Sequence, residues 1–402
     1  VKHVNDEFWR QWVPAVLEAA HESGREDFFM YGEVFSSDPI FNSHFTTNLG
    51  FPSVLDFVLH EALEQYVARD QPADVMAQAF DRDDWFTDTD SNASMQVTFF
   101  GNHDIGRMGR IISSARPGVP ANVLLDKMLL GFDLLFLSRG VPVIYYGDEQ
   151  GFVGDGGDRG ARQTMFPATA SRYVGQATIG SDATVSDDNF DPTHPLYVRV
   201  ADLNRLRAEH PALVTGAHVV GEPQGPVLSF SRIDREERIE YLVVANNGPL
   251  AIPASVRALS ADMDFEVIHG GEGSVRSAAD GTVQVEVPAR SALVLRATEE
   301  LAVPSDPPTI RIVRPDPDTV IPTNRYRIEA EIGDRRYAEV TFSISIAGDE
   351  PVVLGTDDAP PYRVYWNNQD IPAGTSVELI VVVSDGSGRY AADTRTVTLG
   401  SR

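Results

Sequence analysis

The chain has 402 residues, 42% of them hydrophobic, and its 59 acidic and 33 basic residues give a formal net charge of −26. This length exceeds what one hydrophobic core usually serves, so we expect two or three globular domains, and the negative charge disfavours nucleic acid and anionic membranes as partners. Cysteine is absent, which excludes disulfides, thiolate nucleophiles and cysteine-ligated zinc, and no apolar run is long enough for a membrane span.

The first half of the chain alternates helical and strand-like segments. Residues 5–23 place Phe8, Trp12 and Val16 at helical spacing, which predicts an amphipathic helix. Further helices are expected over 58–68, 123–137 and 196–209, and buried apolar strands over 28–31, 97–100 and 142–146. Continuous apolar strands that alternate with helices predict an α/β fold, in which helices cover both faces of a parallel sheet.

The pattern changes after residue 212. Short alternating runs separated by turn residues predict an antiparallel β domain over 213–298. Residues 299–308 form a proline-rich linker, because proline stiffens the backbone and removes hydrogen-bond donors. The strand-like runs over 309–402 predict an immunoglobulin-like β-sandwich with Trp366 as a core aromatic.

Polar residues follow three of the apolar strands, at the position where barrel and open-sheet α/β enzymes build their sites. The first is Glu33, which leaves an apolar strand among aromatic residues. Partial desolvation there would raise its pKa and suit it to donate a proton. The alternative is an ordinary surface glutamate at a strand end.

The second segment, Asn102-His103-Asp104, brings an amide, an imidazole and a carboxylate together after a buried strand. A helix cap is the alternative interpretation, although a cap needs only one such residue. The third segment runs from Tyr145 to Glu149 and is followed by the Gly- and Asp-rich residues 154–158. These residues are either contacts at the rim of a site or a cation site, and they match no EF-hand pattern.

These segments together resemble a known family. Gly32-Glu33-Val34, then Asn102-His103-Asp104, then Gly140 through Glu149 are similar in order and spacing to the α-amylase family of glycoside hydrolases. The resemblance implies that residues 1–212 are the strand 5–8 side of a partial (β/α)8 TIM barrel, followed by two all-β domains. Val1-Lys2-His3 resembles the tail of the motif after strand four, which places the nucleophilic aspartate two residues before Val1.

The resemblance also implies roles for individual residues. Glu33 would be the general acid/base, and Asp104 would stabilise the positively charged sugar at the cleavage point. His103 would hydrogen-bond that sugar, with Lys2 and His3 on the leaving-group side. In calcium-containing relatives the backbone at the His3 position helps to hold the ion, so calcium is a possible cofactor whose other ligands lie upstream. A retaining glycosidase needs two carboxylates ~5 Å apart, and only one of them lies within this chain.

The expected function is hydrolysis of α-glucosidic bonds in starch-like glucans or maltooligosaccharides with retention of configuration, by a secreted or extracytoplasmic parent protein. Transglycosylation on the same barrel is one alternative. Another is that the chain as it stands is an inactive glucan-binding or structural remnant. The sandwich is expected to be a spacer, or a sugar binder if Tyr362, Tyr365 and Trp366 are exposed.

Overall fold

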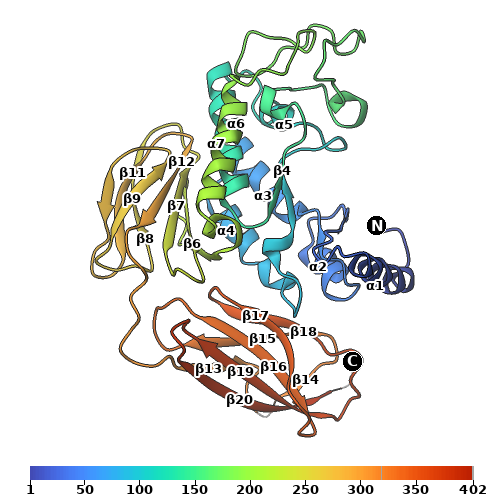
Figure 1. Ribbon diagram of the computed structural model, residues 1–402, viewed down its shortest axis with the longest axis vertical. Coiled ribbons are helices and arrows are strands. Elements are labelled where there is room, and N and C mark those ends of the chain that lie inside the picture. Colours follow the sequence, from blue (N-terminus) through green and yellow to red (C-terminus); the bar gives the residue numbers. More distant parts are fainter. Residues whose placement is uncertain (318, 401–402) are drawn as a thin grey trace.

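The computed structural model describes residues 1–317 and 319–400 (Figure 1). Its first 216 residues contain helices and short parallel strands. In chain order these are α1 (Asp6–Glu22), β1 (Tyr31–Gly32), α2 (Pro39–Thr47), β2 (Ser53–Val54), α3 (Phe57–Leu63), η1 (Glu64–Ala68), α4 (Asp74–Phe80), η2 (Asp83–Phe86), η3 (Ala93–Met95), β3 (Val97–Phe99), α5 (Met108–Ala115), α6 (Ala121–Leu137), β4 (Val141–Val143), η4 (Asp148–Gln150), η5 (Asp158–Ala161), α7 (Pro195–Glu209) and α8 (Ala212–Thr215).

The four strands of this part lie in the order β1-β2-β3-β4 and are all parallel. β1 pairs with β2, β3 pairs with β4, and the isolated bridge between Leu55 and Val97 joins the two pairs. Parallel strands end at the same edge of a sheet, so the loops that follow β1, β3 and β4 share one edge. This arrangement confirms the predicted α/β character of the segment and positions the candidate site.

The outer strands are shorter and more exposed than the sequence predicted. Of the expected strand over 28–31 only Tyr31 is in β1, which continues to Gly32, and Phe28 and Phe29 are exposed. In β4, Val143 is also exposed. The predicted burial was wrong for the two outer strands, β1 and β4. Within the described residues each of them pairs with a neighbouring strand on one side only.

The helices agree better with their predictions. α1, α6 and α7 fall where the periodicity placed them, and the helix over 58–68 is present but ends in the π-helical segment η1. In α1 the buried stripe is Trp9 and Val13, whereas Phe8 and Trp12 are exposed. The stripe formed by Trp9 and Val13 is buried because it packs in a small core with residues of α2 and β2.

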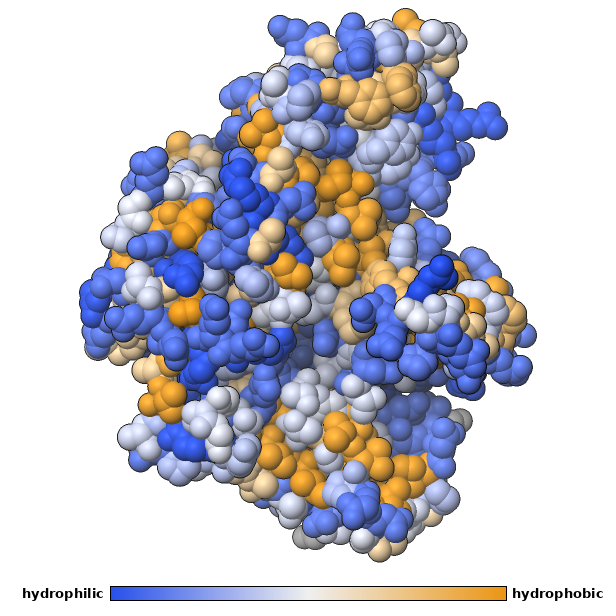
Figure 2. All heavy atoms as spheres, viewed as in Figure 1, coloured by the Kyte–Doolittle hydropathy of each residue, from blue (hydrophilic) through white to orange (hydrophobic). Residues whose placement is uncertain are grey.

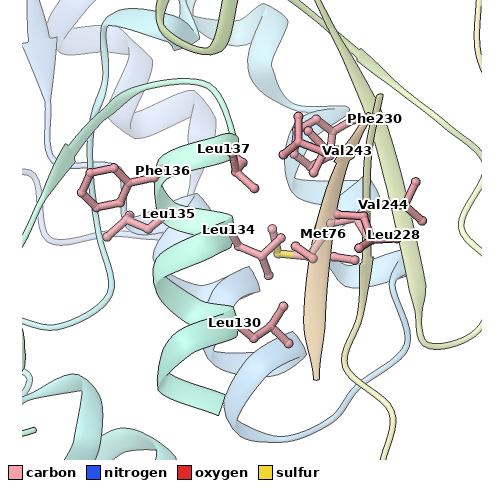
Figure 3. Packing of buried hydrophobic residues seen from close by; sticks show 14 of the residues in the cluster. Met76, Leu130, Leu134, Leu135, Phe136, Leu137, Leu228, Phe230, Val243 and Val244 are labelled. Carbon is pink, nitrogen blue, oxygen red and sulfur yellow. The ribbon is translucent and has the colours of Figure 1, made fainter. Parts of the chain in front are cut away.

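The β domain is packed directly on the helices. Its strands are β5 (Ala217–Val220), β6 (Val227–Ile233), β7 (Glu240–Asn246), β8 (Ile252–Arg257), β9 (Asp264–His269), β10 (Ser274–Arg276), β11 (Thr282–Val287) and β12 (Ser291–Ala297). They form a six-stranded sheet, β10-β9-β12-β7-β6-β5, and a β11-β8 pair. Leu130 and Leu134 of α6 point at Leu228 and Val243 of that sheet, and one continuous apolar core joins both parts (Figure 3).

The last part of the chain is a second all-β unit. Its strands are β13 (Ile310–Arg314), β14 (Val320–Ile321), β15 (Arg325–Ile332), β16 (Glu339–Ile346), β17 (Val352–Asp357), β18 (Tyr362–Asn367), β19 (Ser376–Ser384) and β20 (Tyr390–Leu399). The sheets β13-β15-β18 and β14-β20-β19-β16-β17 enclose a separate core that contains Trp366. We call this unit the sandwich. The closer likeness to an immunoglobulin domain stays a prediction.

The sandwich contacts the first part of the chain through η2. Trp85 stacks on Tyr365 with ring centroids 3.5 Å apart, and Arg363 pairs with Asp81 and Asp84. Since Tyr365 is occupied in this way and Tyr362 and Trp366 are buried, the three aromatics do not form an exposed sugar-binding surface. None of the helices in the described part of the chain is both long and apolar enough to cross a bilayer.

Candidate active site

Glu33 follows β1 directly and lies beside the start of the chain. The amino group of Val1 donates a hydrogen bond to the backbone oxygen of Glu33 (3.0 Å), and Lys2 Nζ donates to the backbone oxygen of Phe35 (2.6 Å). Gly32 allows this approach, because a Cβ there would touch the Val1 side chain. The structure therefore places Lys2 beside the segment that follows Glu33, while His3 is exposed to solvent, and their position on the leaving-group side stays a prediction.

The environment of Glu33 differs from the expectation. Its side chain is exposed rather than partly desolvated, so the predicted burial among aromatics is wrong for this chain. The physical reason is the open edge of β1: the neighbouring Phe35 is itself 48% exposed and covers little of the carboxylate.

His103 and Asp104 lie in a tight loop after β3. Asn102 holds that loop, because its Oδ1 accepts hydrogen bonds from the backbone N–H groups of Asp104 (2.8 Å) and Ile105 (3.0 Å). Asn102 thus caps a turn, and His103 and Asp104 remain free for other contacts. His103 Nε2 is 3.3 Å from Asp104 Oδ1, and both side chains are about half exposed.

A buried arginine that the sequence analysis did not single out ties this loop to the loop after β4. Arg107 is fully buried and donates from Nε to Gln163 Oε1 (2.6 Å), and from Nη1 to the backbone oxygen of Tyr146 (2.6 Å) and to Asp148 Oδ1 (3.1 Å). The guanidinium also lies 4.5 Å from the ring centroid of Tyr145. Arg107 is therefore the central link of a clamp formed by Arg107, Asp148 and Gln163, which fixes the loop that carries Asp104.

The clamp places one carboxyl group in an unusual electrostatic environment. Burial raises the pKa of Asp148 to about 7, and Arg107 opposes that rise. Asp148 also accepts a hydrogen bond from the backbone N–H of Met108 (3.3 Å). The sequence predicted that Asp148 is either a contact at the rim of a site or part of a cation site, but the structure buries its side chain in an ion pair with Arg107.

The glycine-rich loop over 154–158 closes against the Asp104 loop. A Cβ at Gly157 would overlap the carbonyl oxygen of Asp104, so only glycine permits this backbone approach. The two carboxylates of the loop already have arginine partners: Asp155 contacts Arg172 (3.4 Å) and Asp158 contacts Arg162 (3.2 Å). Of the two alternatives for this loop, the structure favours rim contacts over a cation site.

Substituting Gly157 should loosen this contact. We expect Gly157→Ala to reduce the free energy of unfolding by ~1–3 kcal/mol, the range for overpacking a close contact. Gly271→Ala is the control, because a Cβ there meets only ordinary van der Waals contacts at 3.5 Å and beyond. Chemical denaturation of both variants measures the difference, and equal stability would mean that the loop adapts freely.

The described residues of the chain contain no preformed metal site. Within residues 1–317 and 319–400 no group of three or more histidine, aspartate or glutamate side chains could hold an ion. The calcium expectation, which relied on the His3 backbone and on ligands outside this chain, stays a prediction. Nor does any hydrogen bond or ion pair in the described chain join Glu33 to His103 or Asp104, so the site consists of two clusters at one sheet edge.

The sequence and the fold of the chain are similar to those of known proteins. A model of the family described as alpha amylase, catalytic domain, matches residues 3–216. An alpha-amylase of Streptomyces lividans is 39% identical over 395 residues, which cover 98% of this chain and 43% of that protein. A cyclomaltodextrin glucanotransferase of Klebsiella oxytoca is 24% identical over 340 residues, covering 78% of this chain and 47% of that protein. The crystal structure of a Geobacillus thermoleovorans alpha-amylase complexed with acarbose superposes with a TM-score of 0.59 at 21% identity, covering 74% of this chain and 58% of that chain.

Acidic residues at the carboxyl edge of parallel strands, together with the match to a catalytic-domain model, place the chain in the class of glycoside hydrolases and transglycosylases. The chain belongs to the alpha-amylase family of that class, which confirms the resemblance drawn from the motifs. It spans less than half the length of the two curated relatives.

Proposed function

We propose that residues 1–402 supply the acid/base part of a retaining site that cleaves α-glucosidic bonds in starch-like glucans or maltooligosaccharides. The observation that carries this proposal is the shared sheet edge of the loops after β1 and β3, which bear Glu33 and the His103–Asp104 pair. Glu33 donates its proton to the glycosidic oxygen as the bond breaks, and it then removes a proton from the incoming water. The attacking carboxylate is supplied from outside these residues.

The remaining residues bind and orient the sugar. Asp104 is a carboxylate that stabilises the positive charge developing on the sugar ring, and His103 donates a hydrogen bond to the ring hydroxyls. Lys2 and His3 lie on the leaving-group side, where Lys2 is held by the Phe35 backbone. The half-exposed His103 and Asp104 are accessible to such a substrate.

This division of labour predicts that residues 1–402 alone release no measurable reducing sugar from soluble starch, because catalytic groups that act as a unit lose most of the rate when one is absent. A longer parent polypeptide that contains the attacking carboxylate should release sugars with the anomeric configuration retained, as followed by proton NMR. Sugar release by residues 1–402 that disappears in Glu33→Gln would contradict the proposed division.

Transglycosylation is the second candidate function, and the similarity to cyclomaltodextrin glucanotransferases supports it. Both reactions share the same first step and differ in whether water or a sugar hydroxyl accepts the glycosyl group. Incubating the parent polypeptide with maltoheptaose separates them, because abundant products longer than the substrate would identify a transglycosylase. We further propose that the parent protein acts outside the cytoplasm, where polymeric glucans are accessible. Detecting it in the culture medium of its source tests this location.

A further inference from the structure

Two phenylalanine side chains project into solvent from the long loop that joins β4 to α7. Phe166 is 67% exposed and Phe190 is 55% exposed. Their ring centroids are 5.0 Å apart and the ring planes are inclined by 61°, so the edge of one ring contacts the face of the other. Figure 2 shows exposed apolar side chains among polar ones in the uppermost part of the surface, to which this loop (green in Figure 1) contributes. We call these two residues the phenylalanine pair.

Hydrogen bonds within the loop hold the phenylalanine pair in place. The backbone N–H of Asn189 donates to the carbonyl oxygen of Met165 (3.0 Å), which joins the two segments that carry the rings. The Asn189 side chain is buried, and its Nδ2 donates to the backbone oxygens of Thr184 (3.2 Å) and Asp187 (2.7 Å). The two rings therefore project from a backbone with a defined conformation.

The loop also has a small apolar core of its own. Five of its side chains form or cover this core: Phe152, Ala168, Val185, Met165 and Tyr173. Met165 packs against the core, whereas the next residue, Phe166, is mostly exposed. An exposed apolar patch on a firmly held loop is typical of a binding surface.

The same loop borders the strand-end site. It follows β4, whose carboxyl end shares one sheet edge with β1 and β3. The Gly157 backbone lies against the backbone of Asp104, and Tyr173 Oη donates to the carbonyl oxygen of Arg159 (2.5 Å). The segment that contacts the Asp104 loop is thus connected to the core beneath the phenylalanine pair.

We propose that the phenylalanine pair binds a sugar unit of an α-glucan chain beyond the cleavage point, an inference that rests on the proposed α-glucan substrate. One face of a pyranose ring carries C–H groups with slight positive charge, which match the negative face of an aromatic ring. An α-1,4-linked glucose chain coils, so successive sugar faces turn relative to one another. Two rings inclined by 61° fit such a chain better than the flat ribbon of a β-1,4-linked glucan.

Other classes of ligand fit the phenylalanine pair less well. Two aromatic side chains bury at most ~500 Å², which is less than the ~800 Å² that each partner buries in a typical protein interface. Four aspartates over residues 182–191 would repel an acidic polymer. A neutral ligand that stacks on aromatic faces satisfies both constraints.

Isothermal titration of residues 1–402 with maltoheptaose tests the proposal. We expect saturable binding whose Kd changes little between low and high salt, because stacking involves no charged group of the protein. The double variant Phe166→Ala/Phe190→Ala should weaken this binding on the order of tenfold, as expected when the aromatic anchor of an interface is truncated. Its thermal unfolding should stay that of the parent chain, because both side chains are mostly exposed.

A matched control separates this surface from apolar attraction in general. Leu250→Ala/Tyr390→Ala also removes two exposed apolar side chains, 75% and 68% exposed, from the β domain and the sandwich, and it should leave the Kd unchanged. Equal weakening in both double variants would overturn the proposal, as would equally tight binding of cellohexaose. Protection of residues 164–168 and 188–191 from hydrogen exchange in a sugar-free parent polypeptide would also overturn it, because another part of the protein would then cover the pair.

The proposed hydrolysis and this inference can fail separately, because binding by residues 1–402 needs no attacking carboxylate. In an active parent polypeptide, the phenylalanine double variant should raise KM for long maltooligosaccharides severalfold and leave kcat and the cleavage of maltotriose unchanged, as expected for loss of uniform binding. Unchanged KM at every chain length would contradict this inference alone. A parent polypeptide that binds maltoheptaose through the pair but cleaves no glucan would contradict the proposed function alone.

Discussion

Replacing Arg363 with methionine should destabilise the contact between the sandwich and η2 by ~3–5 kcal/mol, the range for removing one partner of a buried ion pair. The Arg363 side chain is 7% exposed and Asp84 is 15% exposed, so Asp84 would be left buried without its counter-ion. Arg363 also pairs with Asp81 at 2.8 Å, but Asp81 is 61% exposed and can be solvated by water. Asp84 therefore accounts for most of the expected loss.

The loss should depend on pH. Burial raises the pKa of Asp84 to about 8, so the folded state holds a proton that the unfolded state releases from about pH 4 upward. Stability from this group is thus lost as pH rises between those values. Without Arg363 to oppose the shift, the pKa of Asp84 should rise further in the variant. The decline should then extend above pH 8, and the deficit at pH 8 should exceed that at pH 5.

Urea unfolding followed by tryptophan fluorescence measures both effects, because Trp85 stacks on Tyr365 across the same contact. Arg311→Met is the control within the sandwich: its pair with Glu331 is exposed and should contribute only ~0–1 kcal/mol. A loss in Arg363→Met no larger than in Arg311→Met would mean that the sandwich is merely tethered by its linker.

This contact illustrates what the sequence could not predict. Arg363 and Asp84 are separated by 279 positions along the chain, and neither lies in a recognisable motif. The sandwich itself was predictable because alternation between apolar and polar residues is local, with a period of two. Its docking depends on side chains that meet only after both parts have folded.

The candidate site divides in the same way. The position of Glu33, His103 and Asp104 beyond strand ends was predictable because each lies shortly after an apolar run, and the strand ends of a parallel sheet share one edge. The exposure of Glu33 was not predictable, because aromatic neighbours in sequence do not show which edge of the sheet is open. One signal could have identified Arg107. This arginine lies close to the motif that contains Asp104, and the later segment Tyr145 to Asp148 contains aromatic rings and a carboxylate with which an arginine can interact.

Removing Arg107 should produce the second large effect that we expect. In Arg107→Met the carboxyl group of Asp148, only 3% exposed, loses its ion pair, and the Tyr146 carbonyl and Gln163 lose their donor. The free energy of unfolding should fall by ~3–5 kcal/mol. Hydrogen exchange should accelerate over 99–107 and 145–163, the segments that the clamp joins. In an active parent polypeptide, kcat should fall ~10²-fold, because a shift of about 1 Å in Asp104 suffices for that loss.

The double variant Arg107→Met/Asp148→Asn separates charge from packing. Asparagine resembles the protonated form of Asp148, whose pKa burial raises to about 7, so the double variant should recover part of the stability lost in Arg107→Met. The recovery should be larger at pH 8 than at pH 5. Without Arg107 to lower it, the pKa of Asp148 rises further in the single variant, so the buried carboxyl group must hold a proton that the unfolded state releases, and stability falls as pH rises. Arg162→Met, which removes an exposed pair with Asp158, is the control and should change stability by ~0–1 kcal/mol. If the double variant recovers nothing at either pH, then Arg107 stabilises the site through its aromatic and backbone contacts and not through its ion pair.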